Sequence, residues 1–202
     1  MRFALSALSA LSLSLLSSSA FANSAGVSGQ SNKQNQSCNG CHFGGTAPTV
    51  TLTGPTELEP GATGQYTLVI TGGAAKVGGM NVAVDNSAAK LAAGTGSKTI
   101  GDEITHIKPQ AFTGNELRFD FSLVAPTTPG TIKIFGAGNS ANGDLGSEGD
   151  RGSTTTLSVT VPGAKGDGSA EAQGGCSTTG NASLLAFALA AAVLPVLRRR
   201  WS

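Results

Sequence analysis

The sequence predicts an all-β protein with a single antiparallel β-sandwich, on three observations. From Thr49 onward, apolar residues alternate with polar ones at a period of two, which is the spacing of a half-buried strand. Turn residues separate the alternating runs. No segment keeps an amphipathic helical period over three turns. About seven or eight short strands fit the pattern, as in an antiparallel sandwich.

The expected strands follow one another in chain order, each marked by apolar residues that share one face. These residues are Val50 and Leu52; Tyr66, Leu68 and Ile70; Met80, Val82 and Val84; Leu117, Phe119, Phe121 and Leu123; Ile132 and Ile134; and Leu157, Val159 and Val161. The clearest strand contains Phe119 and Phe121, because Arg118 and Asp120 point to its opposite face. We therefore place the sandwich domain at residues 37–162.

The composition agrees with an exported β-protein that has many turns. Charged residues make up 12% of the chain, about half the roughly 25% of an ordinary soluble domain. The 202 residues carry a net charge of +1, so the chain has no broad positive surface for nucleic acid or an anionic membrane. Three cysteines are too few for a disulfide-dense scaffold.

The N-terminus has the three parts of a cleavable signal peptide. Arg2 supplies the positive charge, and residues 4–16 form an apolar run too short to span a membrane. Ala20-Phe21-Ala22 fits the cleavage rule, so cleavage is expected after Ala22, with an uncleaved anchor as the alternative. Residues 23–36 are then a loose polar leader with little to bury, and the domain is extracytoplasmic.

The C-terminus combines a flexible linker at residues 163–175 with a sorting or anchor segment at residues 176–202. The apolar run at residues 182–197 would be about 24 Å long as a helix. A bilayer core needs about 30 Å, so the span is marginal. Arg198 and its neighbours would stay on the cytoplasmic side, and the thiol of Cys176 is accessible for processing or acylation. A permanent short helix is the alternative.

The strongest chemical pattern is the CxxCH sequence Cys38-Asn39-Gly40-Cys41-His42, which is the attachment motif of c-type haem. Two thiols at this spacing can bond to the two vinyl groups of one porphyrin, and His42 can then bind the iron. A Cys38–Cys41 disulfide is one alternative. A copper or zinc site that uses His42 and His106 is another.

A haem iron could take a sixth ligand from elsewhere in the chain. His106 is the only other histidine, and it lies in a polar stretch that we expect between strands. Met80 alternates with Val82 and Val84, which favours a core residue over a ligand. Ligation by two histidines would favour electron transfer, whereas an open position would favour small-ligand sensing or peroxidatic chemistry.

An oxygen-rich stretch precedes the last expected strand and contains Asn139, Asn142, Asp144, Glu148 and Asp150. Calcium could bind such a loop, but the spacing is not that of an EF-hand and Asn-Gly-Asp is mainly a turn signal. We expect a turn. No Ser-His-Asp order, phosphate-binding loop or paired-carboxylate motif is visible, so no enzymatic activity is expected.

Two parts of the chain resemble known families. The first is the C-terminus, where Gly175-Cys176-Ser177-Thr178-Thr179-Gly180, the apolar run and Arg198-Arg199-Arg200 resemble the MYXO-CTERM sorting tail of myxobacterial surface proteins. This resemblance implies cleavage by a sorting protease and display on the surface of a Gram-negative bacterium, at the outer membrane.

The second resemblance is that of the domain to the bacterial relatives of the Reeler domain, the group called choice-of-anchor V. It rests on Cys38 to Gly45, Leu58 to Gly61 with Tyr66 to Leu68, Gly78 to Val82, Thr105-His106, Phe119 to Pro126 and Gly136 to Asp144. It implies an Ig-like or Reeler-like sandwich and places Cys41, His42 and His106 at recurrent family positions. It implies no activity.

Together these observations predict an exported, membrane-anchored surface module that binds one haem c and exchanges electrons with a redox partner. The alternative is a surface adhesion or matrix module in which Cys38 and Cys41 form a disulfide. A copper- or zinc-binding module is the weaker alternative.

Overall fold

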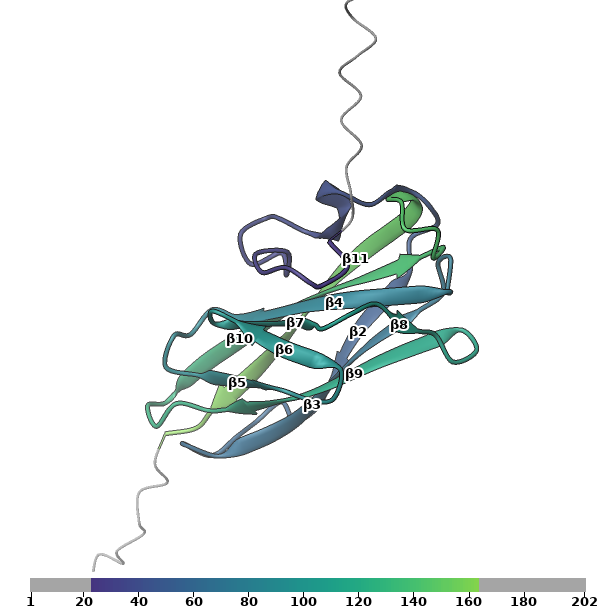
Figure 1. Cartoon of the computed structure of the whole chain (residues 1–202). Coiled ribbons are helices and arrows are strands. Elements are labelled where there is room, and N and C mark those ends of the chain that lie inside the picture. The colour runs from purple at the N-terminus through teal and green to yellow at the C-terminus, as the bar shows by residue number, and fades with distance from the viewer. Residues whose placement is uncertain (1–22, 164–202) are drawn as a thin grey trace, which may run out of the picture. The chain divides into compact units, whose positions relative to one another are not determined.

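Two β-sheets face each other across one apolar core in the computed structural model, which describes residues 23–163 (Figure 1). The elements are η1 (Cys38–Gly40), β1 (Phe43–Gly44), β2 (Thr49–Thr53), β3 (Thr63–Thr71), β4 (Val77–Val84), β5 (Lys90–Ala93), β6 (Ser97–Ile100), β7 (Glu103–His106), β8 (Gln110–Ala111), β9 (Glu116–Val124), β10 (Gly130–Ala141) and β11 (Glu148–Val161). The predicted all-β sandwich is confirmed.

The larger sheet runs in the order β1-β11-β10-β4-β7-β6, with β8 paired to β4, and the smaller sheet runs β2-β3-β9-β5. The strand pairs within both sheets are antiparallel, except for the short parallel pair β1–β11. The six runs of alternating apolar residues named from the sequence correspond to β2, β3, β4, β9, β10 and β11. The period-two pattern therefore located the strands that carry most of the core.

The core forms where the apolar faces of the two sheets meet. In β9, Leu117, Phe119, Phe121 and Leu123 are buried while Arg118 and Asp120 are exposed, as the alternation requires. Tyr66 stacks on Phe121 with ring centroids 5.6 Å apart, and its hydroxyl donates to Pro55 O at 2.9 Å. Full burial of one such side chain contributes roughly 1.5–3 kcal/mol. Met80 also belongs to this core.

His106 does not lie between strands, as the sequence had suggested, but is the last residue of β7. The strand escaped prediction because Glu103-Ile104-Thr105-His106 has a single apolar residue and so no readable alternation. Its position follows from its pairing with β4, in which Asn81 faces Thr105 and Val82 faces Ile104.

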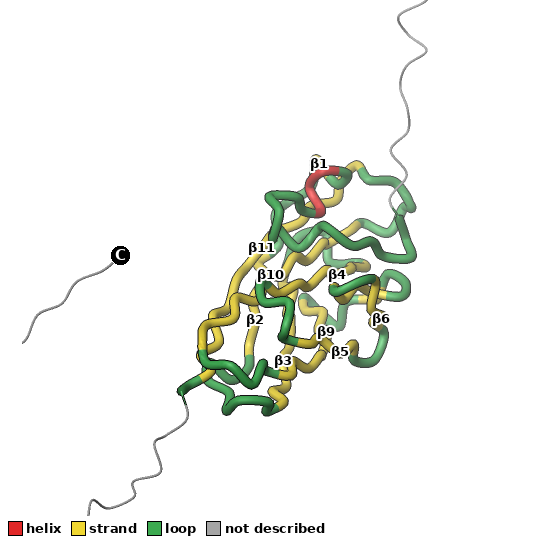
Figure 2. Tube along the Cα trace, turned by 90° about the vertical axis from the view of Figure 1, so that its left-hand side faces the viewer, coloured by secondary structure: helices red, strands yellow, loops and turns green. Residues whose placement is uncertain are grey.

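The segment 23–36 is not the loose leader that its polar composition predicted. Gly29 N donates to Glu103 Oε2 at 2.6 Å, and Gln30 N donates to Asn81 Oδ1 at 2.8 Å. Ser31 is only 1% exposed. Backbone hydrogen bonds to side chains of the larger sheet replace the apolar contacts that the segment lacks. Figure 1 shows this segment, in purple, beside β4 and β11, and Figure 2 shows the short helix η1 next to β1.

The expected signal peptide with its cleavage site at Ala22, the linker beyond Gly163 and the sorting tail with Cys176 lie outside the described residues. Within residues 23–163, no helix has both the length and the apolar character needed to cross a bilayer. Export, tail processing and anchoring therefore stay predictions from the sequence.

Candidate functional site

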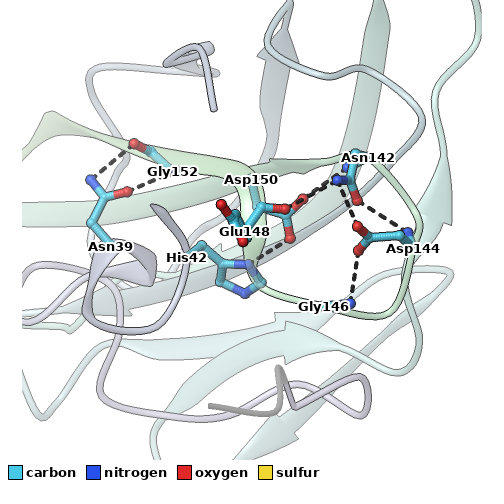
Figure 3. A network of polar contacts seen from close by, with 8 residues as sticks. All are labelled: Asn39, His42, Asn142, Asp144, Gly146, Glu148, Asp150 and Gly152. Atoms are coloured by element: carbon cyan, nitrogen blue, oxygen red, sulfur yellow. Dashed lines mark hydrogen bonds and ion pairs between the residues drawn. The ribbon is translucent and has the colours of Figure 1, made fainter. Parts of the chain in front are cut away.

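The CxxCH sequence folds into one tight turn that is fixed to β11. Cys41 N and His42 N both donate to Cys38 O, at 3.2 and 3.0 Å, so the motif closes on itself. Asn39 then pairs with the backbone of Gly152: its Nδ2 donates to Gly152 O at 3.0 Å, and Gly152 N donates to its Oδ1 at 2.9 Å (Figure 3). The motif is thus bound to a strand that lies 113 residues further along the chain.

Gly152 allows this close approach of the motif to β11. A Cβ atom at this position would lie 2.7 Å from Cys38 Cβ, closer than two such carbons can pack. The requirement for glycine at residue 152 therefore comes from the cysteine turn that packs against it, and not from the strand itself.

His42 is oriented by a buried carboxylate. Its Nδ1 lies 2.9 Å from Asp150 Oδ2, and the Asp150 side chain is 2% exposed (Figure 3). The second carboxylate oxygen, Oδ1, accepts a hydrogen bond from Asn142 N at 2.8 Å. A carboxylate oxygen accepts hydrogen bonds, so this contact suits a ring that carries its hydrogen on Nδ1. The neutral ring then has its lone pair on Nε2, the nitrogen that is free to bind a metal.

His106 lies against β4, where Gly79 makes room for its ring. A Cβ atom on residue 79 would collide with the imidazole. His106 Nδ1 lies 3.1 Å from Met80 N and 3.3 Å from Met80 O. A donor and an acceptor are both within reach, so the ring can adopt the tautomer that leaves Nε2 unprotonated.

The surroundings of His106 favour its neutral form. Burial lowers the pKa of this histidine below its usual 6.5, and electrostatic interactions with Lys98 and His42 lower it further, while the backbone contact with Met80 acts in the opposite direction. Neutral imidazole is the form that binds metal ions. The surroundings of His106 thus favour the form of the ring that can bind a metal ion.

One cavity joins these groups. It has a volume of about 510 Å³, within the roughly 300–1,000 Å³ of small-molecule sites. Its wall includes all four residues that the sequence singled out, namely Cys38, Cys41, His42 and His106, together with Met80. Five further apolar residues line the wall, namely Val27, Val77, Pro109, Ala141 and Leu145. Polar residues such as Asn81, Thr105 and Asn139 line it as well. The segment 23–36 contributes one side of the cavity through Val27 and Gln30.

The two thiols differ in their surroundings. Cys38 is half-buried and Cys41 is exposed, and both are free. Burial raises the pKa of the Cys38 thiol to about 11, and the nearby Cys41 adds to the increase. Cys38 is therefore a protonated thiol at neutral pH, unlike the low-pKa thiolates of redox enzymes.

The oxygen-rich stretch has the form of a turn, as expected. Asp144 N donates to Asn142 Oδ1 at 3.1 Å, and Gly146 N donates to Asp144 Oδ1 at 2.8 Å (Figure 3).

Asn139 does not belong to the turn but to β10. It is buried and lines the cavity, and its Oδ1 has no hydrogen-bond partner. Among residues 23–163, no three His, Cys, Asp or Glu side chains are grouped to hold a metal ion.

Sequence reasoning missed two residues of this site. Asn39 occupies a variable position of CxxCH, and Asp150 looked like part of a polar loop. Both act through partners more than 100 residues away in the chain, Gly152 and His42. The only local signal was the presence of a carboxylate near the start of the last strand.

The comparisons with known proteins supply no family. No family model matches the chain, and no curated protein matches it.

Several solved structures are similar to part of this chain at low identity. The PKD domain of an M14-like peptidase from Thermoplasmatales archaeon SCGC AB-540-F20 is 20% identical, with a TM-score of 0.37, over 57% of this chain and 96% of that one. A CARDB domain from Pyrococcus furiosus, solved in complex with di-metal ions, is 14% identical, with a TM-score of 0.30, over 57% and 89%. BslA, a bacterial hydrophobin, is 11% identical, with a TM-score of 0.26, over 57% and 95%. The site must be interpreted from its own residues.

Proposed function

We propose that this chain is an exported, non-enzymatic surface module that holds one c-type haem for electron transfer. The observation that carries the proposal is that Cys38, Cys41, His42 and His106 all line the same cavity. A CxxCH motif that arose by chance would have no reason to line the same ligand-sized cavity as the second histidine. When bound, the haem would supply one-electron chemistry at its iron.

The residues around the cavity fit such a group. Cys38 and Cys41 offer the two sulfur atoms for thioether bonds, and the tight turn keeps them on one side. His42 would hold the iron through Nε2, because Asp150 occupies its Nδ1. His106 offers a second neutral imidazole. The apolar part of the wall, which includes Val77 and Ala141, would pack against a porphyrin.

The cellular setting in this proposal comes from the sequence. A signal peptide that ends at Ala22 would deliver the chain to the compartment where bacteria attach haem to CxxCH motifs. The tail that follows Cys176 supports display on the surface of a Gram-negative bacterium, through a sorting protease and a lipid or peptide anchor. The resemblance to choice-of-anchor V proteins agrees with this setting and adds no activity.

The test is to produce the full chain in a bacterial host that exports it and matures c-type cytochromes. The wild-type chain should show a Soret band, and its haem should stay with the chain after denaturation. The double variant Cys38→Ser/Cys41→Ser should lose the covalent haem. Cys176→Ser is the matched control, because it removes a thiol outside the cavity domain and should keep the haem. A colourless wild-type chain would overturn the proposal.

A second candidate is a surface adhesion or matrix module in which the cysteines form only a disulfide. The proximity of the thiols favours it, since Cys41 is close enough to raise the pKa of Cys38. In that case the same preparation would be colourless, and the wild-type chain would have a mass two hydrogens below that of its reduced form. The double variant would show no such difference.

A further inference from the structure

Asp150 is the one carboxylate among the residues that line the cavity. It is 1% exposed, and burial of a carboxylate is costly unless its oxygens are paired. Here both oxygens accept hydrogen bonds, Oδ2 from His42 Nδ1 and Oδ1 from Asn142 N. Asp150 would not itself bind the haem, so its effect on that group would be exerted through His42.

The carboxylate is held so firmly that it can impose an orientation on the ring. Asn142, which donates to Oδ1, is itself fixed, because its Nδ2 donates to Glu148 O at 3.1 Å and to Asp144 Oδ2 at 3.0 Å. The backbone of Asp150 is also tied down, since its O accepts from Gly45 N at 3.1 Å. These contacts fix the position of Asp150 Oδ2, so the His42 ring must orient its Nδ1 toward that oxygen.

We propose that Asp150 is a positioning residue that fixes His42 in the Nδ1–H tautomer and aims the Nε2 lone pair into the cavity. The step that concerns electron transfer rests on the proposed function: a carboxylate hydrogen-bonded to Nδ1 makes His42 a stronger donor to iron. A stronger donor stabilises the ferric state, so Asp150 lowers the reduction potential of the bound haem.

The competing explanation is that Asp150 merely anchors the CxxCH turn to the sheet. The structure already provides that anchor in the pair of hydrogen bonds between Asn39 and Gly152. This redundancy gives two matched variants. Asp150→Asn changes the group that faces His42 and keeps the side-chain shape, whereas Asn39→Ala removes an anchor and leaves the carboxylate in place.

The two variants should act differently on the tautomer. In Asp150→Asn, the amide oxygen should stay on the Asn142 N–H, because only the oxygen can accept that bond. The amide NH₂ then faces His42 Nδ1, which must accept, and the hydrogen moves to Nε2. A carboxylate-to-amide change beside a histidine is known to produce the wrong tautomer with little change in geometry.

The tautomer can be read without haem. The full chain, labelled with ¹⁵N-histidine and produced without haem maturation, is measured by long-range ¹H–¹⁵N correlation at about pH 8, where histidines are ordinarily neutral. We expect Nδ1–H in the wild type and in Asn39→Ala, and Nε2–H in Asp150→Asn. A wild-type His42 with its hydrogen on Nε2 would overturn the inference even if the variants failed to fold. A folded Asp150→Asn variant in which His42 still carried its hydrogen on Nδ1 would also overturn the inference.

The haem-loaded chain tests the consequence for the iron. Asp150→Asn should shift the reduction potential to more positive values, whereas Asn39→Ala, which keeps the carboxylate beside His42, should leave it unchanged. Equal potentials in the wild type and Asp150→Asn would overturn this part. If no haem is bound at all, the proposed function fails, while the tautomer measurement still decides the role of Asp150.

Discussion

His42 and Asp150 are 108 residues apart in the chain, yet His42 Nδ1 lies 2.9 Å from Asp150 Oδ2. This contact joins the cysteine motif near the start of the domain to the last strand of the larger sheet. It means that the motif is part of the folded domain and not an appendage to it. A change in β11 can therefore alter the chemistry of His42.

Gly79→Ala should displace His106. The added methyl group would collide with the imidazole, and overpacking of this kind costs roughly 1–3 kcal/mol. Urea denaturation should show the lower free energy of unfolding, and the NMR signals of the His106 ring should shift. Gly40→Ala is the control, because its added Cβ would lie 4.0 Å from Gln30 Oε1, an ordinary contact. Equal stability of the two variants would contradict this account of the Gly79 position.

Phe119→Ala tests the sandwich core. Phe119 is 1% exposed between the sheets, and truncation of a buried phenylalanine costs about 3–5 kcal/mol. Its neighbour Arg118 makes only an exposed ion pair with Glu116, so Arg118→Ala should change stability by less than about 1 kcal/mol. The comparison is made by chemical denaturation. Similar losses in both variants would mean that β9 does not alternate as described.

The stability of the haem-free chain should fall on acidification because of His106. Burial lowers the pKa of this residue in the folded state, so the unfolded chain takes up the proton first. The contribution is fully present above the usual pKa of 6.5 and is lost as the pH falls below that value. His106→Gln should have a shallower pH dependence of the free energy of unfolding between pH 7.5 and pH 5.5, about one unit on either side of 6.5. If the free energy of unfolding depended equally on pH in His106→Gln and in the wild type, the burial of His106 would be contradicted.

The two thiols of the haem-free chain should react at different rates. A pKa of about 11 instead of 9.0 leaves Cys38 with about a hundredfold less thiolate than an ordinary thiol. Iodoacetamide at about pH 8 should therefore alkylate the exposed Cys41 first. Peptide mapping by mass spectrometry gives both rates and separates them from that of Cys176. If Cys38 reacted as fast as Cys41, its surroundings would have to be more open than described.

The sequence predicted those parts of the fold that are determined locally. β9 was predicted because four large apolar residues, from Leu117 to Leu123, alternate with polar ones, and burial on one face is enough to define the strand. β7 was missed because it is placed by pairing with β4 and not by its own pattern. The segment 23–36 was misjudged because backbone-to-side-chain bonds to Asn81 and Glu103 hold it, and such bonds leave no mark in composition.

The candidate site also contains some residues that could be identified from the sequence and others that could not. Cys38, Cys41 and His42 could be selected from the sequence because their spacing carries the chemistry. His106 could be selected because it is the only other histidine. Asn39 and Asp150 could not, since their roles depend on contacts that exist only once β11 lies beside the motif.

The most direct test of the central claim is the intact mass and absorption spectrum of the protein purified from the envelope of its native cells. The account predicts a coloured protein whose denatured mass equals the chain plus one haem, with Cys38 and Cys41 both blocked to alkylation. A colourless protein, with those two sulfur atoms bonded to each other, would contradict it.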